Sequence, residues 1–190
     1  NHFRPDNSSY HVLDYSVATG KVKRKKTVQG YADESAWARG QSWALYGYTM
    51  MYRCTNDPAY LEQAKKIAEF LTNHPHLPKD KIPYWDFNAP VTKTTYRDVS
   101  ASSIMASALL ELGQYVDEAD RNKYVGIATK ILQSLSKKAY RAKPGENGGF
   151  ILKHSVGSLP HKSEVDVPLT YADYYFIEAL LRYQKWYLDK

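Results

Sequence analysis

The chain has 190 residues, of which 43% are hydrophobic and 24% are charged. This composition is ordinary for a globular protein and excludes a chain that is disordered throughout. No apolar run approaches the roughly 20 residues that span a bilayer, so a transmembrane helix is not expected. The formal net charge of +6 suits an acidic partner. No nucleic-acid-binding motif is present, so nucleic acid is a minor option for that partner. A membrane is not predicted as the partner either.

The first predicted element is a β hairpin over residues 10 to 29, whose arms flank the turn signal Ala18-Thr19-Gly20. Its second arm carries the basic run Lys21 to Lys26, which is typical of a solvated strand. Farther along the chain, hydrophobic periodicity predicts five helices. They are expected near residues 34–54, 58–73, 99–116, 119–139 and 169–188.

Acidic residues stand where these helices begin, and a carboxylate at such a position accepts a backbone N–H of the first turn. The predicted caps are Asp33, Asp57, Asp98 and Asp117. The last helix is expected to begin with a capping box formed by Thr170 and Asp173.

The helices repeat as hairpins. A shift of about 64 residues aligns Ile67 with Ile131, and a further shift of about 71 brings Ala108 onto Ala179. In each unit the first helix is apolar on most sides and the second is amphipathic, so we expect the first inside and the second outside. Stacked hairpins favour an open solenoid or a closed α/α toroid. Because the chain is too short to close a ring of six pairs, we predict an all-α protein whose hairpins form about half of an (α/α)6 toroid.

Two long connections interrupt this pattern, at residues 74–98 and 141–168. Structureless connections of this length are unusual in a compact helical protein and are often functional. Both lead into inner helices, so we expect both at the same rim of the toroid.

One stripe of the first inner helix carries polar and aromatic side chains. At 100 degrees per residue, Ser35, Trp43 and Tyr46 fall within about 40 degrees of Arg39. An adjacent stripe of small residues, which includes Gly40, would let a neighbouring backbone approach. An arginine fork pairs with a carboxylate and an indole stacks on a sugar face, so the stripe suits a sugar-acid subsite. In the alternative interpretation, Arg39 pairs with a core carboxylate and Trp43 only packs.

Few other residues point to chemistry. Asp86 lies in a proline-bounded loop with no helix to cap, so it either lines the site or supports the loop. The six histidines form no i, i+4 pair, and Cys54 is the single cysteine, so no metal site is predicted and Cys54 is expected in the core. No phosphate-binding loop, serine triad spacing or convincing pair of glycosidase carboxylates is found.

Several stretches together resemble the unsaturated glucuronyl hydrolases of glycoside hydrolase family 88. The likeness runs through nearly the whole chain, and the WARGQSW stretch looks more like this family than like the unsaturated rhamnogalacturonyl hydrolases. The stretches are SSYHVLDY, TVQGYADESAWARGQSWALYGYTMMYR, IPYWDFNAP, RDVSASSIMASALLEL, GENGGF and EVDVPLTYADYYFIEALLRY. The resemblance implies a six-hairpin α/α barrel of the glycosidase type, of which residues 1–190 would be the C-terminal half.

The resemblance also implies a reaction. These enzymes hydrate the C4=C5 double bond of an unsaturated uronic acid at the non-reducing end of lyase-generated oligosaccharides, without metal or cofactor. Their two catalytic aspartates belong to the N-terminal half, so no catalytic residue is assigned here and the chain alone is expected to be inactive. The implied substrate-binding residues are His11, Gln29, Arg39 and Trp43, with weaker assignments to Trp85, Asp86 and Tyr171.

Two further expectations follow from a half toroid. Apolar seams should be exposed where the missing hairpins would pack, and such seams favour self-association or binding of the missing half. A different class of function stays open, namely a non-catalytic helical-repeat module that binds acidic oligosaccharide or protein.

Overall fold

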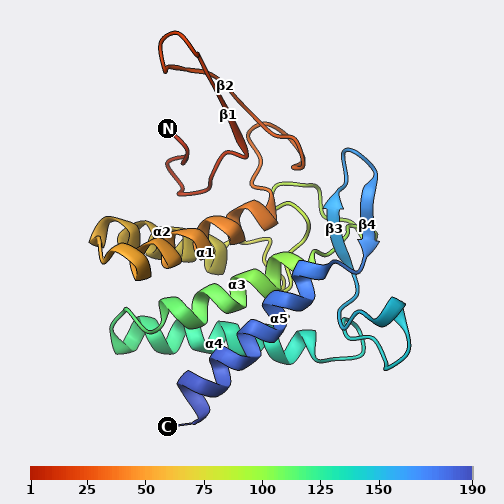
Figure 1. Ribbon diagram of the computed structural model, residues 1–190. Helices are drawn as coiled ribbons and strands as arrows, with labels where there is room; N and C mark the ends of the chain where they lie inside the picture. Colours follow the sequence, from red (N-terminus) through yellow and green to blue (C-terminus); the bar gives the residue numbers. More distant parts are fainter. Residues whose placement is uncertain (190) are drawn as a thin grey trace.

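The computed structural model describes residues 1–189 (Figure 1). Five α-helices form the body of the described chain, and two antiparallel β hairpins accompany them. The helices are α1 (Ala38–Thr55), α2 (Pro58–Asn73), α3 (Val99–Leu112), α4 (Glu118–Leu135) and α5 (Thr170–Tyr183). The strands are β1 (Val12–Tyr15), β2 (Val22–Lys26), β3 (Ser155–Ser158) and β4 (Ser163–Val167). A 3₁₀ turn at Asn147–Gly149 and a π-helical turn at Gln184–Leu188 complete the order.

All five predicted helices are confirmed, and three of the four predicted caps are confirmed with them. The Asp57 carboxylate accepts the Ala59 N–H at 2.9 Å. Asp98 and Asp117 cap α3 and α4 in the same way. These short-range carboxylate bonds satisfy N–H groups that a helix leaves unpaired, which is why the sequence could place them.

Two predicted helix-start signals are wrong, although α5 itself begins at Thr170, close to the expected residue 169. The Asp33 carboxylate accepts the Thr27 N–H at 2.8 Å, and α1 begins only after Trp37, which provides no side-chain cap. The capping box at Thr170 is absent as well, because the Asp173 carboxylate instead accepts the Ile151 N–H at 2.7 Å. In both cases the carboxylate accepts a backbone N–H of a preceding loop instead of one in the first turn of its helix.

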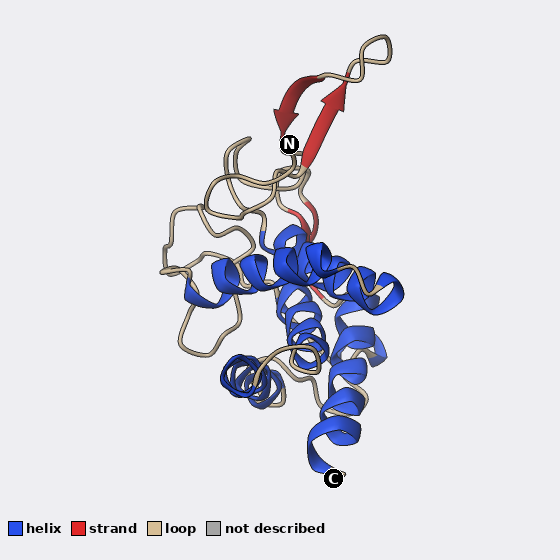
Figure 2. Cartoon of the chain, turned by 90° about the vertical axis from the view of Figure 1, so that its left-hand side faces the viewer, coloured by secondary structure: helices blue, strands red, loops and turns tan. Residues whose placement is uncertain are grey.

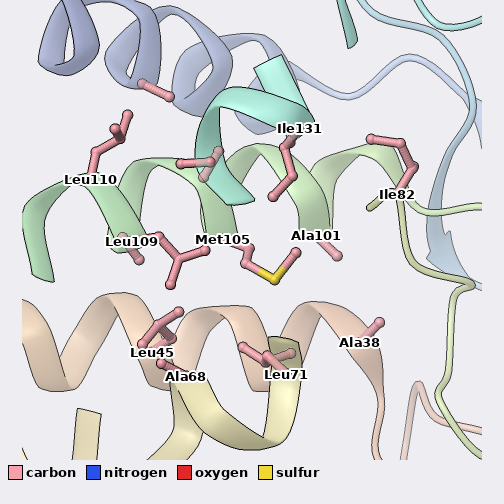
Figure 3. Packing of buried hydrophobic residues seen from close by; sticks show 14 of the residues in the cluster. Ala38, Leu45, Ala68, Leu71, Ile82, Ala101, Met105, Leu109, Leu110 and Ile131 are labelled. Carbon is pink, nitrogen blue, oxygen red and sulfur yellow. The ribbon is translucent and has the colours of Figure 1, made fainter. Parts of the chain in front are cut away.

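The predicted division into inner and outer helices is confirmed. All 14 residues of α3 are buried, and α3 packs between α1 and α5 while also contacting α4. In Figure 3, Leu109 of α3 and Leu45 of α1 both point into the space between the two helices. The outer helix α2 buries one stripe that includes Ile67 and Leu71. An inner layer of α1, α3 and α5 is thus backed by α2 and α4, as the hairpin repeat predicts.

The hairpin β1–β2 was predicted and is confirmed; Figure 2 shows it standing away from the helices. The hairpin β3–β4 was not predicted, since residues 141–168 were expected to be a loop. Its strands are short, and His154, Lys162, Glu164 and Asp166 all adopt positive φ angles between 52° and 67°. Such left-handed backbone at non-glycine residues breaks the alternation by which a strand is recognised.

Both long connections reach the same rim, as expected. The N-terminal ends of α1, α3 and α5 lie beside β3 in Figure 1. The Ala38 N–H donates to the Trp85 carbonyl at 3.1 Å, and the Val99 N–H donates to the His154 carbonyl at 3.2 Å. The rim therefore collects segments that lie far apart in the sequence.

Two further findings on residues 1–189 concern a possible membrane-spanning helix and the location of Cys54. None of the helices described has the length and apolarity that crossing a bilayer requires. Cys54 is exposed near the end of α1, so its predicted place in the core is wrong. The last turn of α1, where Cys54 lies, is exposed to solvent, and the local sequence pattern does not reveal this exposure.

Candidate substrate-binding site

Arg39 lies in the first turn of α1 and is only 3% exposed. Its Nη1 donates to Asp98 Oδ2 at 3.1 Å and also to the Val156 carbonyl. Its Nη2 donates to the Gly157 carbonyl at 2.7 Å. The guanidinium carbon lies 4.5 Å from the centre of the Trp37 ring, which covers it. Arg39 thus joins α1, α3 and β3 at one point.

Asp98 completes this junction from inside. It is fully buried, and while Oδ2 pairs with Arg39, Oδ1 accepts the Ser100 N–H at 3.1 Å. A buried carboxylate needs such a partner and such hydrogen bonds to stay charged. The alternative interpretation of the sequence, in which Arg39 pairs with a core carboxylate, agrees with this geometry.

Gln29 and His11 reach the same junction from the N-terminal segment. Gln29 Nε2 donates to the Gly157 carbonyl at 3.0 Å, so that carbonyl accepts from both Gln29 and Arg39. His11 Nδ1 accepts the N–H groups of Val28 and Gln29 at 3.1 and 3.2 Å. Because Nδ1 is an acceptor, the neutral imidazole carries its proton on Nε2, where it can donate. Burial lowers the pKa of His11, and the charge of Arg39 lowers it further.

Trp43 belongs to an aromatic wall on α1 and α5. Its ring centre is 5.1 Å from that of Tyr175, edge to face, and 6.3 Å from that of Tyr171. Tyr175 in turn packs edge to face against Tyr46 at 5.0 Å. Trp43 and Tyr171 are both half-buried, so each keeps part of its ring accessible. We define the aromatic wall as Trp43, Tyr46, Tyr171 and Tyr175.

Glycines at the small stripe of α1 serve a different purpose from the one expected. A Cβ on Gly40 would lie 2.7 Å from the Trp37 ring, whereas one on Gly47 would meet nothing within 4 Å. Gly40 makes room for the indole that covers Arg39, and no neighbouring backbone approaches here. The expectation of a close backbone contact was wrong, because Trp37 folds back over its own helix.

Trp85 and Asp86, the weaker assignments, are buried beneath the rim. Trp85 is 6% exposed and packs against Val156. Asp86 is 1% exposed, and its Oδ2 accepts the Ser35 hydroxyl at 2.7 Å and the Tyr31 N–H at 2.9 Å. Of the two roles left open for Asp86, the geometry matches support of the loop. Neither side chain presents a surface to a ligand.

A second buried polar cluster was missed by the sequence analysis. Glu111 of α3 is 1% exposed and pairs with Arg182 of α5 at 2.8 Å and with Arg53 of α1 at 3.1 Å. Glu178 accepts the Tyr46 hydroxyl at 3.1 Å, and burial raises the pKa of Tyr46 to about 12, so that hydroxyl stays a donor. A glutamate within the apolar run SALLELG was the available signal. This cluster ties the aromatic wall to the core.

The site as a whole offers an aromatic surface and a half-buried imidazole at one rim, next to the buried Arg39–Asp98 pair. This combination suits a sugar, because aromatic faces pack on sugar rings and an imidazole N–H can donate to a sugar oxygen. Among residues 1–189, no three His, Cys, Asp or Glu side chains gather as a metal site would require.

Comparisons with known proteins agree with this chemistry, although no family model matches the chain. The chain is 50% identical over 182 residues to the unsaturated glucuronyl hydrolase of Formosa agariphila, an alignment that covers 96% of this chain and 45% of that relative. A crystal structure of an unsaturated glucuronyl hydrolase specific for heparin superimposes with a TM-score of 0.94 at 55% identity, covering 97% of this chain and 49% of that one.

A variant of the unsaturated glucuronyl hydrolase from Streptococcus agalactiae, complexed with dGlcA-GalNAc6S, matches with a TM-score of 0.82 at 33% identity. That match covers 98% of this chain and 49% of the other. The chain spans about half the length of the curated relatives it matches. In sequence over 96% of its length and in fold over 97%, the chain is similar to unsaturated glucuronyl hydrolases.

Proposed function

We propose that the protein hydrates the C4=C5 double bond of an unsaturated uronic acid at the non-reducing end of lyase-generated oligosaccharides. Water adds across the bond, with the proton going to C4 and the hydroxyl to C5. The hemiketal so formed opens, and the neighbouring sugar leaves together with its oxygen. The observation that supports this reaction most is the junction of His11, Gln29 and Arg39 next to the aromatic wall, whose Tyr171 ring centre lies 5.4 Å from the Arg39 guanidinium carbon. The chain is also similar to hydrolases of this name.

The proposal gives each side chain a role that its surroundings allow. Trp43 and Tyr171, which keep accessible ring surface, pack on the sugar. His11 donates from Nε2 to an oxygen of the uronate. Arg39 and Gln29 act as positioning residues, because they both donate to the Gly157 carbonyl and so fix it.

The chain is proposed to form one part of a single catalytic toroid, and the aspartates that move the proton are proposed to lie in another part. On this view residues 1–190 alone bind the unsaturated uronate but do not hydrate it. The names of the relatives favour this enzyme over a non-catalytic helical-repeat module.

The reaction is tested by loss of ultraviolet absorbance from unsaturated disaccharides of chondroitin, hyaluronan and heparin, with the full-length protein. Loss is expected on at least one of them, and the saturated disaccharides serve as controls. A Trp43→Ala variant should raise KM, whereas Trp43→Phe should retain much of the binding. Constant absorbance on all three substrates would contradict the proposal.

The exposed face of α5 fits a chain that packs against more of the same toroid. Tyr174, Ile177 and Leu181 follow one another at helical spacing and are 59%, 44% and 61% exposed. We propose that further hairpins cover this face in the whole protein, and that residues 1–190 alone self-associate through it. Sedimentation of the chain should show association that Leu181→Glu reduces and that Lys66→Glu, at an exposed position of the outer helix α2, does not.

A further inference from the structure

The loop between α4 and β3 surrounds a cavity of about 450 Å³ that is separate from the aromatic wall. In Figure 1 this loop lies at the right, below β3 and β4. Cations, one carboxylate and several apolar side chains line the cavity, and six of these residues are important for its chemistry. They are Lys138, Arg141, Lys143, Glu146, Phe150 and Ile151.

The cavity carries an excess of positive charge. Lys143 has one carboxylate nearby, with its Nζ 3.6 Å from Glu146, whereas Lys138 and Arg141 form no ion pair within residues 1–189. Lys153 Nζ donates to the Lys138 carbonyl at 2.8 Å and thereby brings a fourth cation close. A helix C-terminus favours cations, which accounts for Lys138 just beyond α4 but not for Arg141 and Lys143.

The walls of the cavity are held by backbone hydrogen bonds. The Ala142 N–H donates to the Ile151 carbonyl at 2.9 Å, and the Lys153 N–H donates to the Tyr140 carbonyl at 2.8 Å. Asp173 anchors the loop to α5 by accepting the Ile151 N–H. A ligand would therefore meet a loop that is already ordered, which lowers the entropic cost of binding.

We propose that this cavity binds a sulfate or carboxylate group of an acidic oligosaccharide. The planar fork of Arg141 matches either group, and the lysines add charge. Phe150 and Ile151, both half-buried, offer apolar surface to the attached sugar ring. The ligand class rests on the proposed function, whereas binding in the cavity requires no reaction.

The inference is tested by calorimetric titration of the chain carrying Trp43→Ala, which weakens the aromatic wall as a competing site. The ligands are a sulfated heparin tetrasaccharide, a hyaluronan tetrasaccharide that has carboxylates only, and neutral cellotetraose. Arg141→Ala with Lys143→Ala should weaken acidic-ligand binding about tenfold, because charge-assisted hydrogen bonds are lost. Arg141→Lys should weaken it less. Lys130→Ala, which removes an exposed cation of α4 outside the cavity, should leave it unchanged.

Equal affinities of the double variant and the Lys130→Ala variant would overturn the inference, and so would equally tight binding of cellotetraose. A preference for the heparin over the hyaluronan ligand assigns the cavity to sulfate, and the reverse assigns it to carboxylate. If the proposed function fails but the cavity binds acidic ligands, the full-length protein shows no hydration, while the double variant still binds the acidic tetrasaccharides more weakly than the parent does. If only the cavity is refuted, hydration persists and the double variant binds as the parent does.

Discussion

Arg39 Nη1 lies 3.1 Å from Asp98 Oδ2, and the two residues are 59 positions apart in the sequence. Both side chains are buried, and Asp98 also caps α3. The pair therefore holds together the inner helices α1 and α3 at the rim where the candidate site lies. Loss of this ion pair should therefore lower both the free energy of unfolding and the affinity for the substrate.

Arg39→Ala is expected to lower the free energy of unfolding by about 3–5 kcal/mol, because Asp98 is left as an unpaired buried charge. Adding Asp98→Asn should restore part of this loss, since asparagine keeps a cap without the charge. Urea unfolding measures both variants. Arg24→Ala, which breaks the exposed pair with Asp14, is the control and should change stability far less, because solvent screens an exposed ion pair. An Arg39→Ala chain as stable as this control would contradict the prediction.

Gly157→Ala should disturb the carbonyl that Arg39 and Gln29 share. A Cβ on Gly157 would lie 2.6 Å from the Cβ of Glu164, so β3 or β4 must shift at a cost of about 1–3 kcal/mol. Glu164 has a φ of 53°, so Glu164→Gly removes the clashing atom and fits the left-handed backbone.

A double-mutant cycle of these two changes, followed by urea unfolding, should show a smaller cost of Gly157→Ala when residue 164 is glycine. Gly126→Ala is the matched control. It meets nothing within 4 Å in the middle of α4 and should stabilise the chain by about 1 kcal/mol. Strict additivity within the cycle would refute the clash as the cause.

Tyr175 is expected to position Trp43 rather than to touch the sugar. Tyr175→Ala removes the edge-to-face contact at 5.1 Å, which contributes about 0.5–1.5 kcal/mol beyond burial, so KM of the full-length protein should rise while kcat changes less. Tyr175→Phe retains the ring and should restore KM. Tyr15→Ala, which truncates an exposed tyrosine of β1, serves as control. If the phenylalanine variant behaves like the alanine variant, the hydroxyl and not the ring is responsible.

Acid should destabilise the chain in part through His11. Burial and Arg39 lower the pKa of the folded imidazole below 6.5, so the unfolded state binds the proton more readily. Stability is therefore complete above about pH 6.5 and is lost as the pH falls toward the folded pKa. His11→Asn keeps an acceptor for the loop amides and removes this titration.

The measurement compares melting temperatures at about pH 7.5 and about pH 5.5, on either side of the ordinary histidine pKa. Between these two pH values, the melting temperature of the His11→Asn chain should fall by less than that of the parent. His74→Asn should act in the same direction, because burial lowers the pKa of His74 as well. Identical losses in the parent and both variants would show that these imidazoles do not contribute.

The site could be predicted from the sequence only in part. The spacing along α1 placed Arg39 and Trp43 on one face, because a helix repeats its geometry within a few residues. His11 and Gln29 were assigned by family resemblance alone, and the aromatic partner Tyr175 was not found at all. His11, Gln29 and Tyr175 contact residues from other segments of the chain, so no local sequence pattern could indicate their roles.

The sequence by itself determined the five helices, the first hairpin and the order of inner and outer layers. These follow from apolar periodicity and from caps that act within one turn. The tertiary structure alone decided where the polar groups find partners. Gln29 donates to a carbonyl 128 residues away, and Asp86 accepts from a serine 51 residues away. Buried polar groups must be satisfied by whatever the fold brings near, and only the packed chain specifies that.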